Sequence, residues 1–267
     1  MPELAEVEYY RKQWDPGVGK RVKRVRLYPQ ARVFRECDTA QLEKALTGAV
    51  LERSFAHGKQ MLFGFSDGGW LGIHLGMTGK LFTQATPYAP DRHDHLVLEQ
   101  KACVLVFHDT RLFGRVRFDL GKEPPAWWRE QAPDLLSEAF TPEVMQAFLK
   151  RRARSPLKAV LLMQERFPGI GNWMADEILW RAALHPSTPA GSLTPRQTSK
   201  LYTTVREVCA DALDVIGTDW GDPPAMWLFP HRWEDGGHCP KTGKALVRET
   251  IGGRTTCYSP ARQKLSR

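Results

Sequence analysis

The chain has 267 residues, of which 42% are hydrophobic and 25% are charged, an ordinary composition for a globular protein with one or two cores. No apolar run approaches the ~20 residues that cross a bilayer, no secretory signal pattern is visible, and the five cysteines are scattered, so we expect a cytoplasmic protein without a membrane partner. Lys and Arg number 38 against 30 Asp and Glu, an excess that fits solvated surface charge and a polyanionic partner about equally well.

The predicted elements change character twice along the chain. Residues 3–15 read as a helix that ends before an Asp-Pro-Gly turn. Short β-type runs then follow, separated by Gly- and Pro-containing turns, a pattern typical of a β-sandwich or barrel. These runs are residues 21–27, 62–65, 70–75, 96–98, 104–108 and 115–118. After a Pro- and Trp-rich boundary, helical patterns cover residues 142–151, 156–164, 173–183 and 195–216, and the C-terminal segment returns to short strands. We therefore expect an α+β fold with a β domain, a helical domain and a small β appendage.

The N-terminus is the first candidate site. If the initiator Met is removed, Pro2 carries a secondary amine, and because an α-amino group titrates near ~7.7–8.0, much of it is unprotonated near neutral pH. Such an amine can attack a sugar aldehyde carbon and give an iminium, with Glu3 and Glu6 as nearby carboxylates for proton transfer. The plainer alternative is that Pro2 only opens a helix at its first turn.

A glycine-rich turn precedes the third predicted helix of the C-terminal half. Gly169 and Gly171 allow a tight turn, and Asn172 sits where it could cap the helix that follows. Free N–H groups and the helix dipole make such a terminus a natural anion site, and with Arg154 and Lys158 nearby in sequence we expect a DNA phosphate there. An ordinary turn between helices is the alternative.

Two turns in the β-rich half carry side chains suited to a base stack. Met77 lies in one of them, and Arg111 and Phe113 lie in the other. Two apolar groups and a guanidinium could fill the gap that a flipped base leaves in a duplex. Residue type alone, however, favours the core for Met77 and Phe113.

The C-terminal segment does not offer the ligands of a structural zinc site. Such sites use four thiolate or imidazole ligands, typically as two closely spaced pairs. Cys239 and Cys257 each lack a nearby second cysteine. A makeshift site with His238 or His231 is conceivable, but we expect no metal.

Several of these segments occur together in one order, and through them the chain resembles the formamidopyrimidine-DNA glycosylase / endonuclease VIII family over essentially its whole length. Each motif is weak alone, but the ordered combination is specific. The matching segments are Pro2-Glu-Leu with Glu6-Val-Glu, Gly58-Lys, His74-Leu-Gly-Met-Thr-Gly, Arg92-His-Asp-His, Asp109-Thr-Arg-Leu-Phe-Gly, Gly169-Ile-Gly-Asn-Trp-Met-Ala-Asp-Glu and Gly252-Gly-Arg-Thr-Thr.

The resemblance implies an N-terminal β-sandwich with a catalytic N-terminal helix over residues 1–125, a helix–two-turn–helix domain over 126–228 and a zincless β-hairpin finger over 229–267. It implies a monomeric base-excision repair enzyme that acts on double-stranded DNA containing oxidised bases or abasic sites. The reaction would be base release followed by β,δ-elimination through a Schiff base on the N-terminal proline, without a cofactor. In a bacterium the enzyme would be associated with the nucleoid.

The same resemblance implies roles for individual residues. Pro2 would be the nucleophile on C1′, Glu3 would handle protons at the sugar, and Lys59, which alone reads as a surface lysine, would contact phosphate near the lesion. His74, Asn172 and Arg254 look like a phosphate clamp. Met77, Arg111 and Phe113 look like the void-filling triad, with Arg111 facing the orphaned base. The full set of implied DNA-contacting residues is Glu6, His74, Met77, His93, Arg111, Phe113, Asn172 and Arg254.

The chain also departs from the family pattern. Leu112 stands where members often have a second arginine, so one phosphate contact is expected to be missing. Residues 217–224 look short for a loop that covers flipped 8-oxoguanine, which favours formamidopyrimidines, hydantoins or oxidised pyrimidines as lesions. The alternative function is a non-catalytic, lesion- or structure-specific DNA-binding protein on the same fold. The joint presence of Pro2, Glu3 and Lys59 argues against it, because binding alone does not require that set.

Overall fold

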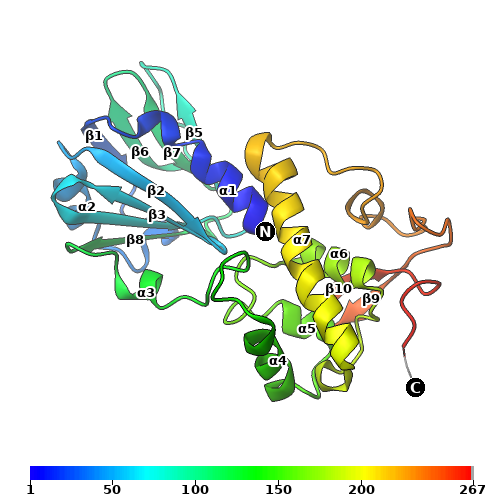
Figure 1. Cartoon of the computed structure of the whole chain (residues 1–267). Helices are drawn as coiled ribbons and strands as arrows, with labels where there is room; N and C mark the ends of the chain where they lie inside the picture. Colours follow the sequence, from blue (N-terminus) through cyan, green and yellow to red (C-terminus); the bar gives the residue numbers. More distant parts are fainter. Residues whose placement is uncertain (266–267) are drawn as a thin grey trace. The chain divides into compact units, whose positions relative to one another are not determined.

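The computed structural model describes residues 1–265 and separates into two compact units. The N-terminal unit contains residues 1–2 and 6–131, and the C-terminal unit contains Glu3–Ala5 and the chain from Ala132 onward. In Figure 1 the first unit runs from blue to green and the second from green to red, except for Glu3–Ala5, which lie in the blue segment. Within the described residues, no helix is both long and apolar enough to cross a membrane.

The N-terminal unit is a sandwich of two four-stranded antiparallel sheets (Figure 1). One sheet has the order β1–β6–β7–β5 and the other has the order β2–β3–β4–β8. The strands are β1 (Val22–Leu27), β2 (Leu51–His57), β3 (Gln60–Phe65), β4 (Gly69–His74), β5 (Lys80–Gln84), β6 (Asp94–Gln100), β7 (Val104–His108) and β8 (Arg115–Leu120). The helices are α1 (Leu4–Lys12), whose first two residues belong to the other unit, α2 (Thr39–Leu46) and α3 (Ala126–Arg129).

Alternating apolar side chains on facing strands form the core of the sandwich. Leu105 and Phe107 on β7 and Phe63 on β3 are fully buried in one cluster. Trp14, after α1, closes this core: its ring lies 4.7 Å from that of Phe63, and its indole Nε1 donates to the Val106 carbonyl at 3.2 Å. Because side chains of a strand alternate between faces, a period of two suffices to define this core.

The C-terminal unit is helical and is built around α6 (Asn172–Ala182), which is buried on nearly all sides. The other helices are α4 (Pro142–Arg151), α5 (Leu157–Leu161) and α7 (Pro195–Asp219). Thr141 and Thr194 accept hydrogen bonds from the first turns of α4 and α7, the usual way for a hydroxyl side chain to start a helix. Helix α6 ends at Ala183, which adopts a left-handed conformation with φ 58°.

A β-hairpin packs against α6 in the same unit (Figure 1). Its strands are β9 (Val247–Ile251) and β10 (Arg254–Tyr258). Gly252 and Gly253 connect them with φ values of 59° and 76°, a backbone conformation that a tight two-residue turn requires and that glycine adopts without strain.

The sequence missed part of the N-terminal unit and misplaced several ends. Strands β2 and β5 and helix α2 were not predicted. Helix α1 ends at Lys12 instead of residue 15, because a short 3-10 turn at Asp15–Gly17 follows it. Helix α7 continues three residues beyond the predicted end at residue 216, and α5 is shorter than predicted. The α+β class and the order of sandwich, helical part and hairpin are confirmed.

Candidate functional site

Glu3 is held at the N-terminus of α6 by its side-chain carboxylate. Its two oxygens accept hydrogen bonds from the backbone N–H groups of Gly171 at 2.8 Å, Trp173 at 2.9 Å and Met174 at 3.1 Å. The side chain is 3% exposed. Three donors and the positive end of a helix dipole all stabilise the negative carboxylate at this place. The turn is thus an anion site, as predicted.

The occupant of this anion site differs from the prediction. We expected a DNA phosphate, but the Glu3 carboxylate already takes these N–H groups. Nor is Asn172 the cap: the cap position is Gly171, and Asn172 is the first helical residue. Lys158 was expected to support a phosphate there, yet it is fully buried and bonded within the protein.

Gly171 is a glycine because Glu3 lies against it. A Cβ on Gly171 would stand 2.3 Å from Cδ and 2.4 Å from Oε1 of Glu3, closer than atoms can approach. The Leu4 N–H also donates to the Gly169 carbonyl at 3.0 Å, so the chain directly after Pro2 is fixed at two consecutive residues. Pro2 itself is half-buried and precedes α1 by two positions, so it is not the first residue of that helix.

His74 lies at the end of β4 among cationic side chains of the N-terminal unit. Burial, and after it the positive charges of Lys59 and Arg115, lower its pKa from 6.5 to about 4. Its Nδ1 accepts a hydrogen bond from the Gly76 N–H at 3.0 Å. The ring is therefore neutral near pH 7 with its proton on Nε2, which makes it a neutral N–H donor beside the half-buried Lys59.

The buried carboxylate of Asp109 brings the two predicted turns together. It accepts hydrogen bonds from the Thr78 hydroxyl at 2.6 Å, the Arg111 N–H at 3.1 Å and the Gly114 N–H at 2.7 Å. Gly76 packs so closely on the other turn that a Cβ on it would lie 2.4 Å from the Phe113 carbonyl carbon. The loop after β4 and the loop after β7 thus form one rigid surface.

Met77, Arg111 and Phe113 project from this surface. Met77 and Phe113 are each 42% exposed, so the expectation from residue type that they lie in the core is wrong. The Arg111 guanidinium carbon lies 4.8 Å from the centre of the Phe113 ring. Leu112, which lies between Arg111 and Phe113 in sequence, has φ 57° and packs against the sandwich core, so both of these neighbours face solvent.

His93 and Glu6 are the other two predicted DNA-contacting residues in the N-terminal unit. The ring of His93 is half-buried and lies 5.7 Å from that of His108, and its carbonyl accepts from the Asp109 N–H at 3.0 Å. His93 therefore adjoins the Asp109 loop. Glu6 is half-buried on α1.

Asp176, one turn after Asn172 on α6, is the centre of a buried ionic network in the C-terminal unit. Its carboxylate accepts from Lys158 Nζ at 2.5 Å and from Arg232 Nη2 at 2.6 Å. Burial lowers the pKa of Lys158, and the negative charge of Asp176 acts in the opposite direction without cancelling this effect. Two cations on one buried carboxylate hold α5 and the segment before the hairpin to α6.

The same helix face fixes strand β10. Asp176 accepts from the Cys257 N–H at 3.1 Å, and Asn172 Nδ2 donates to the Thr255 carbonyl at 2.8 Å. These are alternate residues of β10, so the strand is held at two points. Arg254, which starts β10, remains exposed. The structure thereby links Asn172 and Arg254, both from the predicted phosphate clamp, within one unit.

No group of three or more His, Cys, Asp or Glu residues suited to a metal occurs in residues 1–265. At the position of the conceivable zinc site, Cys239 is buried and its Sγ accepts from the Trp180 indole Nε1 at 3.3 Å. Burial raises the pKa of this thiol, but hydrogen bonds from Thr242, Trp180 and Ser259 outweigh it and lower the pKa to about 7. Packing and hydrogen bonds hold the foot of the hairpin.

Two buried acidic residues that hold the candidate site in place were not predicted from the sequence. Asp109 and Asp176 both stand inside the quoted motifs, but we assigned neither a role. Each is a fully buried carboxylate with three or more hydrogen bonds. An acid within a motif beside small or apolar residues is a signal that could have marked them.

Comparisons with known proteins agree with this geometry. Residues 1–116 match the formamidopyrimidine-DNA glycosylase N-terminal domain, and residues 131–221 match the formamidopyrimidine-DNA glycosylase H2TH domain. Curated formamidopyrimidine-DNA glycosylases are similar: that of Thermus thermophilus is 37% identical, with 98% of both chains covered, and that of Carboxydothermus hydrogenoformans is 32% identical, with 99% of this chain and all of the relative covered. A crystal structure of Lactococcus lactis Fpg with abasic-site DNA superposes with a TM-score of 0.88 at 25% identity over 98% of this chain and 99% of that chain.

The chain belongs to the formamidopyrimidine-DNA glycosylase family. It is therefore a base-excision repair enzyme, a DNA glycosylase with AP lyase activity.

Proposed function

We propose that this protein removes oxidised bases from double-stranded DNA and cuts the resulting abasic strand through a Schiff base on Pro2. The observation that carries the proposal is the position of Glu3: a buried carboxylate, fixed by three backbone N–H groups, is covalently adjacent to the residue that bears the amine. A carboxylate on the residue that follows an amine nucleophile is suited to exchange protons with the sugar while the amine bonds to it.

The steps follow from the chemistry of a secondary amine. After removal of Met1, the unprotonated nitrogen of Pro2 attacks C1′, and the base leaves with the electrons of the glycosidic bond. Opening of the sugar ring, with a proton delivered to the ring oxygen by way of Glu3, gives an iminium between Pro2 and C1′. Loss of a C2′ proton then expels the 3′ phosphate, and a second elimination expels the 5′ phosphate. Hydrolysis releases Pro2.

The remaining residues would hold the DNA. In the proposal, His74 donates its Nε2–H to a phosphate as a neutral group, and Lys59 supplies the positive charge beside it. Asn172 and Arg254 contact the backbone from the α6–β10 side of the C-terminal unit. Contacts of this kind position the duplex without reading its sequence.

Met77, Arg111 and Phe113 would enter the duplex where the damaged nucleotide leaves it. Their exposure and the Asp109 hydrogen bonds beneath them support this role, because an inserted side chain must be both accessible and rigid. His93 and Glu6 remain predicted DNA contacts.

The substrate class is also a proposal. Helix α7 extends to Asp219, which shortens further the predicted loop of residues 217–224. A short loop offers little cover for a flipped 8-oxoguanine, so we expect formamidopyrimidines, hydantoins and oxidised pyrimidines to be the better substrates. Division of the chain at residues 125 and 228, and a cytoplasmic, nucleoid-associated location, belong to the same proposal.

Borohydride trapping tests the chemistry directly. The Met-processed protein should form a covalent adduct with abasic duplex DNA, because borohydride reduces the iminium to a stable amine. A variant with an N-terminal extension, in which the Pro2 nitrogen is an amide, should form none, whereas the same extension at the C-terminus should have no effect. Intact-mass analysis must first verify that Met1 is absent. Tight binding to lesion DNA without adduct or strand cleavage would favour the non-catalytic alternative.

A further inference from the structure

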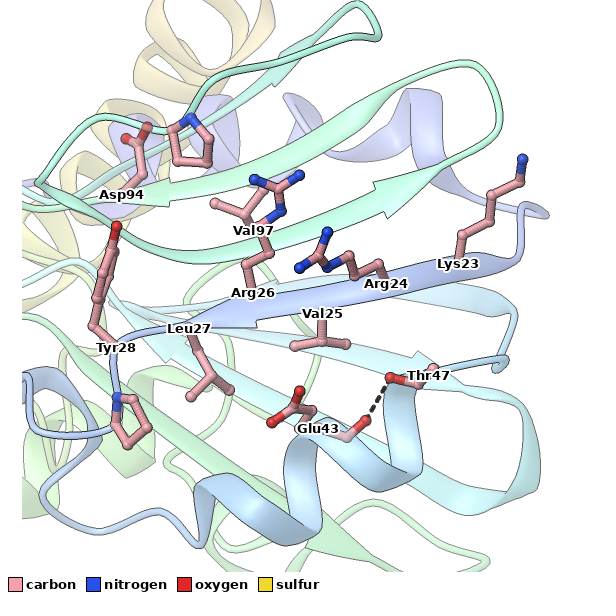
Figure 2. A pocket seen from close by; sticks show the side chains of 12 residues that line it. Lys23, Arg24, Val25, Arg26, Leu27, Tyr28, Glu43, Thr47, Asp94 and Val97 are labelled. Carbon is pink, nitrogen blue, oxygen red and sulfur yellow. Dashed lines mark hydrogen bonds between the residues drawn. The ribbon is translucent and has the colours of Figure 1, made fainter.

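A groove of about 540 Å³ runs along β1 in the N-terminal unit (Figure 2). Arg24 and Arg26 stand on one side of the strand with Val97 of β6, and Glu43 of α2 lies on the other side. None of the residues proposed for the reaction lines it. The groove therefore requires an explanation of its own.

The floor of this groove is an open sheet edge. Strand β1 is the outermost strand of its sheet, and over Lys23–Leu27 its cross-strand partner within the described chain is β6 alone. Tyr28 donates its N–H toward β6, to the His95 carbonyl at 3.4 Å. Because backbone groups alternate in direction along an antiparallel strand, the N–H and C=O groups of Val25 and Leu27 face away from β6 and into the groove.

The open part of the edge has a definite length. At its start, the Val22 N–H donates to the Ala49 carbonyl and the Val22 carbonyl accepts from Gly48, so the edge is occupied up to that residue. The five residues 23–27 that follow span about 17 Å at ~3.3 Å per residue. An added strand of about five residues fits this space.

The charge of the edge is strongly one-sided. Residues 20–26 read Lys-Arg-Val-Lys-Arg-Val-Arg, with five cations and no acid in seven positions. Lys23 and Arg24 are exposed and form no ion pair within residues 1–265, whereas Arg26 pairs with Glu99 at 2.5 Å. Arg24 and Arg26 lie two positions apart and on the same side of the strand (Figure 2). Acidic side chains at alternate positions of an added strand would meet them.

We propose that the outer edge of β1 docks an acidic, extended peptide segment of another protein by β-strand addition. Backbone hydrogen bonds to Val25 and Leu27 would give the affinity, and acidic side chains of the added strand would select the partner through Lys23 and Arg24. The site would recruit the enzyme to a partner without using its DNA-contacting residues.

The same features disfavour two other occupants. A second copy of this chain would place five cations against five cations, and basic edge strands are a known means of preventing such self-pairing. A DNA strand could use the cations, but phosphates only accept hydrogen bonds, so the carbonyl groups of Val25 and Leu27 would stay unpaired. An acidic peptide satisfies both the charges and the backbone.

The probe is a fluorescently labelled eight-residue peptide of alternating Glu and Thr. The full-length protein is titrated into it, and binding is followed by the fluorescence anisotropy of the peptide. We expect saturable binding that the double variant Lys23→Glu/Arg24→Glu weakens about tenfold or more, since two attractions become repulsions. Arg196→Glu/Lys200→Glu on α7, two exposed cations with the same change of net charge, is the matched control and should bind as the parent does.

Backbone pairing is tested separately from charge. The same peptide with every backbone amide N-methylated keeps its charges but has no N–H group to donate to the edge, so it should bind at least tenfold more weakly. Hydrogen exchange should show new protection of the Val25 and Leu27 amides when the unmodified peptide binds. Borohydride trapping on abasic DNA should be unchanged in Lys23→Glu/Arg24→Glu, which separates this site from the reaction.

Three results would overturn the proposal. Equal binding of the N-methylated peptide would show charge attraction without strand addition. No peptide binding, together with loss of undamaged-duplex affinity in Lys23→Glu/Arg24→Glu, would assign the edge to nucleic acid. If the parent protein sediments as a dimer and Lys23→Glu/Arg24→Glu sediments as a monomer, the β1 edge is a self-association surface.

Discussion

Gly171 leaves no room for a side chain next to Glu3, so the substitution Gly171→Ala directly tests how Glu3 is held at the proposed active site. A Cβ would stand 2.3 Å from Glu3 Cδ, so the carboxylate must leave the N-terminus of α6. Three hydrogen bonds to a carboxylate, at about 1.5–3 kcal/mol each, set an upper limit of several kcal/mol. Because the freed N–H groups regain water and the three contributions overlap, we expect a loss of about 2–4 kcal/mol in unfolding free energy.

The effect on the reaction should exceed the effect on folding. A misplacement of about 1 Å beside the reacting carbon can cost on the order of 10²-fold in rate, so base release by Gly171→Ala should fall by about that factor at a temperature where the variant is folded. Single-turnover base release and urea unfolding are the two assays. Gly121→Ala is the control, since its Cβ would meet only the Glu123 carbonyl oxygen, at 3.5 Å. Parent-like release and stability in Gly171→Ala would refute the idea that this contact fixes Glu3.

Three further outcomes are expected. The pKa of His74 is lowered from 6.5 to about 4, so its neutral form stabilises the fold above pH 6.5 and this stabilisation is lost as the pH falls toward 4; from pH 7 to pH 5 the parent should lose about 2 kcal/mol more than His74→Gln in urea unfolding. Asp176→Asn leaves two buried cations short of a carboxylate and should cost about 3–5 kcal/mol, with faster hydrogen exchange in β10; unchanged exchange would count against its role in holding the hairpin. Phe113→Ala should alter stability by less than ~1 kcal/mol because the ring is exposed, yet slow base release from duplex DNA about tenfold or more; an unaffected rate would remove Phe113 from the proposed wedge.

Sequence periodicity was enough for the sandwich core and the order of the parts, but not for the short or strongly polar elements. Strand β2, Leu51–His57, has exposed Glu52, Arg53 and Phe55 and therefore shows no clean alternation. Strand β5 has a single fully buried residue, Leu81. Such strands form because a neighbour supplies their hydrogen bonds, and this information lies elsewhere in the chain.

The candidate site was predictable to the extent that local chemistry defined it. The Gly-rich turn was correctly read as an anion site, since free N–H groups follow from the turn itself. Its occupant was not predictable, because Glu3 lies 168 residues from Gly171 in sequence. The same limit applies to Met77 and Phe113: residue type favours burial, and only the hydrogen bonds of Asp109 show that their loops are held at the surface.

The hairpin shows how a finger can keep its position without the ligands of a zinc site. A metal would join the hairpin foot to itself, whereas the Asp176 network joins β10 to the helix whose first turn binds Glu3. Asn172, in that first turn, reaches β10 from the same side. The hydrogen bonds that fix the carboxylate of Glu3, next in sequence to the proposed nucleophile Pro2, and those that hold β10 therefore originate from one short stretch of α6. Any distortion of this stretch should therefore impair both the proposed proton transfer by Glu3 and the proposed contact of Arg254 with the DNA backbone. A zinc site confined to the hairpin would not couple these two functions.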